Sequence, residues 1–241
     1  ISGRPWRKVA EHYLSAGIPF EALPYPALKH YRYRLAEGAT AVVVGEGDSP
    51  VVAVREYGRG RVVGVGYHNY GLFPELEARR GEPVENCWEY LFSLLMRAII
   101  WSAGKEPRVL LRAVEPSATR FTPERAGGVR LVLANSGAPS SVRVAVTFRD
   151  EQRQAEGEAV RTVRLGRGET EVRLPLPEGP AASGRHFVEA IVTAGGQKQD
   201  WGAASYLVRA RARVSKVMPD AGAVAAGGVL TGRARLAGEM R

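Results

Sequence analysis

The sequence has almost no cysteine and no long hydrophobic run. Its 241 residues contain one cysteine, Cys87. A single cysteine excludes an internal disulfide framework and any metal site built from several cysteines. No stretch approaches the roughly 18 to 20 apolar residues that cross a bilayer, so we expect no membrane span. Many secreted sandwich proteins also use no disulfides, and we favour an extracellular or periplasmic location.

Lysine is also scarce, although the chain is basic. Lys and Arg number 34 against 25 Asp and Glu, a formal net charge of +9, and only five of the basic residues are lysines. Clustered cations bind nucleic acid because they release counterions from phosphates. The arginines here are scattered singly along expected strands and give a diffuse positive field. We therefore expect no nucleic-acid partner.

Apolar residues, in contrast, suffice for two domains. They make up 45% of the chain, enough to fill real cores at this length. The sequence begins at Ile1 without an initiator Met and closes with "LAGEMR" inside an expected strand. We expect it to be a piece of a longer polypeptide.

The first part of the chain, up to Pro107, mixes helix and strand signals. The stretch "PWRKVAEHYLSAG" has apolar residues at helical spacing and predicts a short helix that stops at Gly17. The runs "TAVVV", "PVVAVRE" and "RVVGVG" are apolar at nearly every residue and indicate strands covered on both faces. Gly58 and Gly60 predict a hairpin that pairs residues 51–56 with 61–66. A strand follows this turn, which argues against a phosphate-binding loop.

A second helix is expected over residues 86–103, "NCWEYLFSLLMRAIIWSA". Its apolar stripe is wide, which implies burial against a sheet and against a further element. Gly104 and Pro107 predict its end.

After Pro107 the pattern changes to short alternating runs separated by polar, Gly-rich turns. Seven such runs lie within about 100 residues, and they are typical of a two-sheet sandwich. The inward positions are predicted to be Val129, Leu131, Leu133, Val142, Val144 and Val146.

The last 30 residues repeat the start of this sandwich. A shift of 103 residues places Pro116 on Pro219, Arg130 on Arg233 and Leu133 on Leu236 without a gap. Because the shift equals about one sandwich, we expect a second sandwich to begin near residue 210 and to be cut off.

Three segments of the first part carry a family resemblance: "GIPFEALP", "SPVVAVREYGRGRVVGVGYHNYGLFP" and "WEYLFSLLMRAIIWSAGKEP". Over residues 16–107 the chain resembles class I glutamine amidotransferase-like domains of large bacterial proteins, including the trimerisation domain of some β-galactosidases. The resemblance implies the C-terminal part of a flavodoxin-like α/β domain, often followed by an immunoglobulin-like sandwich.

The expected fold is thus α/β plus all-β. Residues 1–107 are a partial amidotransferase-like α/β domain, residues 108–209 are an immunoglobulin-like β-sandwich, and residues 210–241 start a second β-sandwich.

Reactive residues are few. Cys87 is the only thiol, and its setting "VENCWEY" lacks the small neighbours of a nucleophile elbow. The four histidines show no metal-ligand spacing, so we expect no metal and no cofactor. No catalytic residue is assigned.

Five residues are candidate ligand contacts. His68 follows a strand and lies beside Tyr67, Asn69 and Tyr70, where ligands often meet open α/β sheets. The alternative is a loop histidine that caps the sheet edge. Trp201, ahead of the last sandwich strand, is the fifth, with core packing as its alternative.

The sequence favours a non-catalytic structural or interaction segment of a larger bacterial protein linked to polysaccharide processing. Its partners would be neighbouring domains of the same chain, a second copy bound through the α/β domain, or carbohydrate. Two alternatives stay open: part of an amidotransferase-like or glycoside hydrolase enzyme whose active site lies mostly upstream, and a carbohydrate-binding sandwich.

Overall fold

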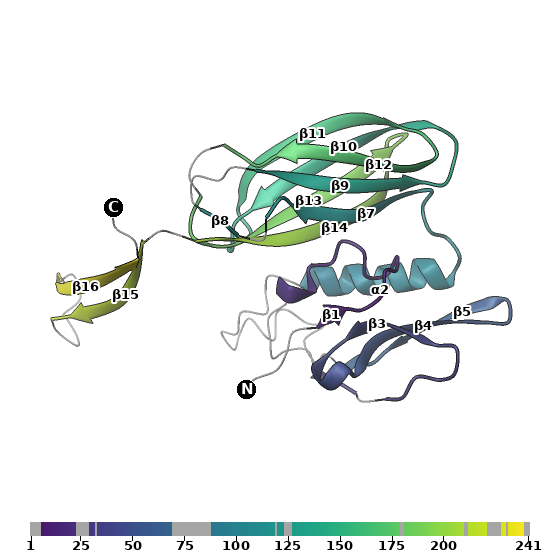
Figure 1. Ribbon diagram of the computed structural model, residues 1–241, viewed down its shortest axis with the longest axis horizontal. Helices are drawn as coiled ribbons and strands as arrows, with labels where there is room; N and C mark the ends of the chain where they lie inside the picture. The colour runs from purple at the N-terminus through teal and green to yellow at the C-terminus, as the bar shows by residue number, and fades with distance from the viewer. Residues whose placement is uncertain are drawn as a thin grey trace.

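A computed structural model describes residues 6–22, 29–31, 33–68, 88–118, 120–122, 127–178, 181–209, 212–220, 228–229 and 231–238. Figure 1 shows three layers: a β-sandwich, the helix α2 (Trp88–Ser102) beneath it, and a small sheet beneath the helix. Within the described ranges, no helix is long and apolar enough to cross a membrane.

The small sheet is antiparallel throughout. Its order is β1-β3-β4-β5, built from β1 (Arg7–Lys8), β3 (Thr40–Val44), β4 (Pro50–Tyr57) and β5 (Gly60–Val65). The predicted hairpin is confirmed as β4–β5, and Gly58 takes the positive φ of +58° that the turn needs. The described residues of this part also include two single turns, η1 (Phe20–Ala22) and η2 (Glu46–Asp48), and a short strand pair, β2 (Lys29–His30) with β6 (Tyr67–His68).

One expectation for this part is wrong, and a second is confirmed only in part. The predicted helix before Gly17 is absent, because the main chain of Arg7 and Lys8 pairs with Val44 and Val43 instead. Long-range pairing therefore overrides the local helical period. The flavodoxin-like α/β class is not what the described residues show either, since their sheet is antiparallel and has one α-helix against it.

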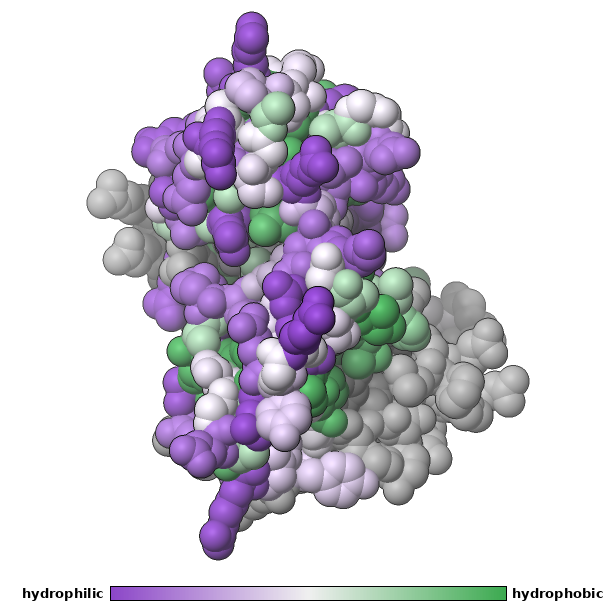
Figure 2. Space-filling view, turned by 90° about the vertical axis from the view of Figure 1, so that its right-hand side faces the viewer, coloured by the Kyte–Doolittle hydropathy of each residue, from purple (hydrophilic) through white to green (hydrophobic). Residues whose placement is uncertain are grey.

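The second predicted helix is confirmed as α2, with its end marked by Gly104 at a φ of +64°. Its apolar stripe is buried from two sides, as the width of the stripe predicted. Leu94 and Trp101 belong to a core that includes Val52 of the small sheet and Phe187 of the sandwich. The opposite face of the helix leaves apolar side chains exposed, Met96 by 52% and Ile99 by 60%. Figure 2 shows apolar surface on the lower half of the molecule and a mainly hydrophilic upper half.

The sandwich confirms all seven predicted strand runs. Its bounds are β7 (Val109–Pro116), β9 (Gly128–Asn135), β10 (Ser140–Arg149), β11 (Ala155–Leu165), β12 (Gly168–Pro175), β13 (Gly184–Ala194) and β14 (Gln197–Val208), with the short β8 (Arg120–Phe121). One sheet has the order β12-β9-β7 and the other β11-β10-β13-β14-β8. These strands form a two-sheet β-sandwich, as their alternating pattern predicted.

The two sheets meet over one apolar core. The six residues predicted to point inward are all buried in it: Val129, Leu131, Leu133, Val142, Val144 and Val146. His186 is also buried there, stacked on Tyr206 with 5.4 Å between ring centroids. Both of its ring nitrogens lie 2.8 Å from oxygens, of Glu156 and of Ala182, so this histidine is used for structure.

A last hairpin, β15 (Ala212–Pro219) with β16 (Gly232–Gly238), follows the sandwich. In Figure 1 it stands to the side of the other layers.

Removing a core side chain tests the sandwich. Leu133→Ala leaves a cavity between the sheets, and we expect it to lower the free energy of unfolding by about 2–5 kcal/mol. Urea unfolding monitored by circular dichroism measures this loss. Glu169→Ala on the exposed face of β12 is the control, and a loss below about 1 kcal/mol for Leu133→Ala would contradict the assigned core.

Candidate functional site

The main buried polar site of the described residues lies at the junction between α2 and the sandwich. Arg97 of α2 is 4% exposed, and Asp200 of β14 is 9% exposed. The Arg97 Nη2 lies 2.9 Å from Asp200 Oδ1, and Nη1 donates to the carbonyl oxygen of Tyr13 at 2.7 Å. A further bond joins Nη2 to the carbonyl oxygen of Trp201. One guanidinium therefore connects the helix, the N-terminal segment and the sandwich.

The carboxylate of Asp200 has further partners. Oδ2 accepts the backbone N–H of Leu111 at 2.7 Å, and Oδ1 accepts that of Trp201 at 2.9 Å. Burial raises the pKa of Asp200, while Arg97 and these two N–H groups oppose the rise. The Leu111 bond caps an N–H on strand β7, so Asp200 also ties the edges of the two sandwich sheets together.

A second ionic contact joins the first turn of α2 to the loop between β10 and β11. Arg153 donates to the hydroxyl oxygen of Tyr90 at 2.6 Å and pairs with the carboxylates of Glu89 and Glu189. Its guanidinium also lies 4.6 Å from the ring centroid of Phe187. The helix residues that make these contacts, Tyr90 and Arg97, lie about two turns apart, so the helix is held against the sandwich at two points.

The N-terminal segment reaches the sandwich through two glycines. The backbone N–H of Ala203 donates to the carbonyl oxygen of Gly17 at 2.6 Å. A Cβ atom on Gly17 would lie 2.7 Å from the Cα of Gly202, and Gly17 also has a φ of +61°. Only glycine permits so close an approach of the two backbones.

Arg61 ties the β4–β5 hairpin to the other end of the helix. Its Nη1 lies 2.6 Å from Glu106 Oε1 and donates to the carbonyl oxygen of Trp101 at 3.0 Å. The guanidinium also sits over the Trp101 ring, 5.0 Å from the centroid. The hairpin, helix and sandwich are thus connected in series.

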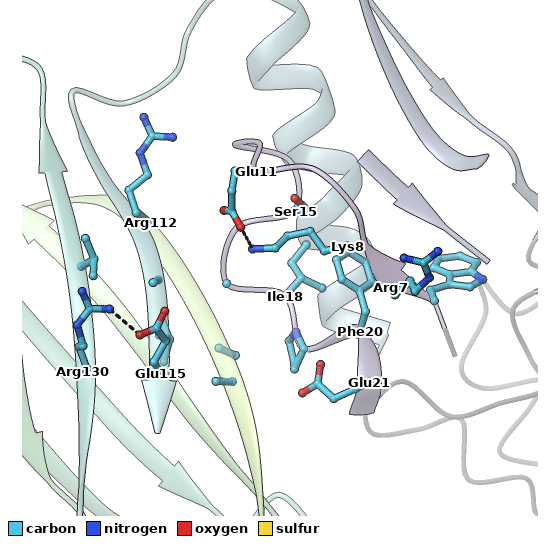
Figure 3. Close-up of a pocket in the computed structure, with 18 of the residues that line it drawn as sticks. Arg7, Lys8, Glu11, Ser15, Ile18, Phe20, Glu21, Arg112, Glu115 and Arg130 are labelled. Carbon is cyan, nitrogen blue, oxygen red and sulfur yellow. Dashed lines mark hydrogen bonds and ion pairs between the residues drawn. The ribbon is translucent and has the colours of Figure 1, made fainter. Parts of the chain in front are cut away.

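A groove of about 540 Å³ lies between residues 7–21 and the outward face of β7 and β9. Figure 3 shows the charged side chains on its two walls. An ion pair lies on each wall, Lys8 with Glu11 at 2.8 Å and Arg130 with Glu115 at 2.6 Å. Ser15 is the only hydroxyl or thiol among the residues that line it, and its Oγ bonds to backbone carbonyls. The groove offers charge but no activated nucleophile.

Metal chemistry has no support in the described ranges, where no three His, Cys, Asp or Glu side chains gather as metal ligands would. His12 packs its ring edge against Trp101, with 5.0 Å between centroids, and burial lowers its pKa. It therefore serves the core of the first part.

The structure describes three of the five candidate ligand contacts. Tyr67 and His68 form β6, opposite His30 and Lys29. Asn69 and Tyr70 lie outside the described residues, as does Cys87. A ligand role for Tyr67, His68, Asn69 and Tyr70 stays a prediction.

Trp201 lies in the junction itself. Its ring stacks on Tyr90, with 5.6 Å between centroids. It also lines a groove of about 340 Å³ together with Tyr13, Met96 and Lys198. The Trp201 ring therefore packs against Tyr90, and the residue also lines this groove.

Sequence reasoning missed Arg97, Asp200 and Arg153. One signal was present: Arg97 is the only charged residue between Glu89 and Lys105. A cation inside a helix that is apolar nearly all round requires a buried partner. Nothing in the sequence indicated which acid that partner was.

Comparisons with known proteins give distant structural likenesses only. No protein-family model matches the chain, and no curated protein sequence matches it significantly. A glycosyl hydrolase family 2 member from Bacteroides cellulosilyticus is similar at 14% identity and a TM-score of 0.38, over 46% of this chain and 16% of that one. A putative beta-galactosidase from Bacteroides fragilis is similar at 17% identity and a TM-score of 0.34, over 57% and 19%.

A third solved structure has an unrelated activity. The alkylpurine DNA glycosylase AlkC of Pseudomonas fluorescens is similar at 17% identity and a TM-score of 0.34, over 58% of this chain and 43% of that one. The chain thus spans less than half the length of each of these three proteins, and likenesses this distant carry no argument about function. The comparisons also give no support to the resemblance to glutamine amidotransferase-like domains.

The junction makes a direct prediction. Arg97→Met leaves the Asp200 carboxylate buried without its cation, and we expect the free energy of unfolding to fall by about 3–5 kcal/mol. Urea unfolding measures the change. The double variant Arg97→Met, Asp200→Leu removes both charges and should be less destabilised than the single one.

The control for this prediction is Lys8→Met, which breaks the exposed pair with Glu11 and should cost about 0–1 kcal/mol. If Arg97→Met and Lys8→Met lowered the free energy of unfolding equally, the buried Arg97–Asp200 pair would not be what stabilises the junction.

Proposed function

We propose that this chain is a non-catalytic structural segment of a larger protein, in which the helix-bearing layer and the sandwich act as one stiff spacer. The observation that carries the proposal is the buried Arg97–Asp200 pair, which bonds to three parts of the fold at once. A spacer must keep the orientation of its parts under load. Directional, charge-assisted bonds in a dry interface do this better than apolar contact alone.

The contacts across the junction have the character of a domain core. Phe187 and Ala203 of the sandwich share one apolar cluster with Trp6, Leu14 and Leu94. Relative motion of two units is the default where an interface is small and polar. Here motion would expose apolar side chains and separate buried charges, so a fixed arrangement is favoured.

The biological setting rests on the sequence resemblance alone. Amidotransferase-like domains of this kind are attached to large bacterial proteins, including β-galactosidases. We accordingly propose that the larger protein is concerned with polysaccharides, and that the neighbouring domains of the same chain are the first partners of this segment. We also propose, from the same resemblance, that two copies of the chain associate through residues 1–107.

Carbohydrate binding is the second candidate function. The observation that favours it is the groove of about 340 Å³ next to Trp201, which also presents Tyr13, Lys198 and Gln199. An aromatic edge with a few polar groups suits a sugar ring. A glycan array separates the candidates, because binding that is lost in Lys198→Ala but kept in Lys105→Ala would favour this function.

The third candidate function is part of an enzyme whose active site lies mostly in residues upstream of this chain. Glutaminase and glycosidase assays on the chain test it, and we expect no turnover. Activity that is abolished by Cys87→Ser or His68→Ala would overturn the structural proposal.

Stiffness has its own test. We expect the chain's helix-bearing layer and sandwich to unfold in a single cooperative transition, because they share one core. Gly202→Val places a side chain against Leu111 and Gly17, where a Cβ atom already meets contacts of 3.0 and 3.2 Å. This variant should split the transition in two, as measured by calorimetry.

Gly166→Val is the control, because Gly166 lies in the β11–β12 turn, has no positive φ, like Gly202, and a Cβ atom there meets nothing within 4 Å. It should leave a single transition. Two separate transitions in the unaltered chain would contradict the stiff spacer.

A further inference from the structure

The terminal hairpin β15–β16 repeats the hairpin β7–β9 of the sandwich. A shift of 103 residues carries Val109 and Pro116, the ends of β7, onto Ala212 and Pro219, the ends of β15. The same shift carries β9, Gly128–Asn135, onto residues 231–238, and β16 is Gly232–Gly238. The strands and the segments between them therefore match in length to within one residue.

The pairing within the two hairpins is also the same. Val114 pairs with Leu131, and at the shifted positions Val217 pairs with Ala234. The six remaining partner pairs of β7–β9 all recur in β15–β16 at the same shift of 103 residues.

Even the irregularity of the pairing recurs. The register shifts between Leu111 and Ala113 in β7, and between Val214 and Lys216 in β15. Beyond the strands, the N–H of Ser117 donates to the Gly128 carbonyl at 2.8 Å, and that of Asp220 donates to the Thr231 carbonyl at 2.9 Å. A generic hairpin has no reason to place a bulge at a given residue, because bulges are specific features of a fold.

The two hairpins differ in what covers them. Val114 and Leu131 are buried in the sandwich core. Their counterparts are exposed, Val217 by 67%, and Ala234 likewise. Residues directly opposite on an antiparallel pair share a face, so Val217 and Ala234 mark the face of β15–β16 that corresponds to the inner face of β7–β9.

The first sandwich also shows what covers such a face. The core around Val114 is completed by β10, β13 and β14, through residues such as Val144, Val188 and Tyr206. All three strands follow the β7–β9 pair in the chain. A two-stranded hairpin alone is marginal in water, so the repeated pair requires an equivalent cover.

We propose that β15–β16 is the first strand pair of a second sandwich, and that its Val217–Ala234 face docks an antiparallel sheet of the β10–β13–β14 kind from the residues that follow it in the polypeptide. Only residues 209–211 separate β14 from β15. So short a connection restricts the angle between two successive sandwiches. The proposal does not depend on the proposed spacer function, although a tandem of sandwiches would lengthen such a spacer.

A chimera supplies the missing sheet. Residues 1–238 are followed by a second copy of residues 136–209, which joins the hairpin at the position where the first sandwich continues. We expect amide hydrogen exchange in β15 and β16 to slow at least 100-fold relative to the 241-residue chain, because a packed sandwich core closes over the hairpin.

Two substitutions provide matched controls. Val217→Asp should return the exchange in the chimera to the fast rate and change nothing in the 241-residue chain. Lys216→Asp, at the neighbouring position on the opposite face, should leave the slow exchange intact. In case the small Ala234 packs too loosely, the chimera is also made with Ala234→Leu, which restores the side chain of its counterpart Leu131.

Two results would overturn the proposal. One is fast exchange in both chimeras, with and without Ala234→Leu. The other is a concentration-dependent dimer of the 241-residue chain that Val217→Asp abolishes, measured by sedimentation, because the hairpin face would then belong to a second copy.

Discussion

The whole arrangement depends on a buried cation in an apolar helix. Arg97 lies in the middle of α2, which is buried on one side by the small sheet and on another by the sandwich. An unpaired charge in such a place would cost several kcal/mol. The guanidinium finds its partners in Asp200, the Trp201 carbonyl and the Tyr13 carbonyl, and all three are available only when the layers are assembled. Folding of the helix is therefore coupled to docking of the sandwich.

This coupling explains why the other junction contacts are arranged as they are. Asp200 can hold Arg97 because the backbone N–H groups of Leu111 and Trp201 fix its carboxylate. Gly17 and Gly202 allow the N-terminal segment to lie close enough for the Tyr13 carbonyl to reach the guanidinium. Nothing in this network resembles a nucleophile with its base. Its bonds hold the helix, the N-terminal segment and the sandwich together, and we therefore favour a structural role.

The sequence predicted the elements whose signals are local. The alternating runs of the sandwich, the glycine turn of β4–β5 and the wide stripe of α2 all follow from side-chain period and turn chemistry. The bulge-matched hairpin at the end was visible as a weak repeat. What the sequence could not predict depends on distant partners: Arg97 and Asp200 are 103 positions apart, and Arg153 and Glu89 are 64 apart. The segment before Gly17 has a helical period, but its strand pairing with β3 decides its structure.

The central claim is that the helix-bearing layer and the sandwich form one rigid body. Residual dipolar couplings of backbone amides in a single alignment medium test it most directly. The account predicts that one alignment tensor fits the couplings of residues 40–65 and 128–208 together. Two tensors of different magnitude for these two ranges would show independent motion and contradict it.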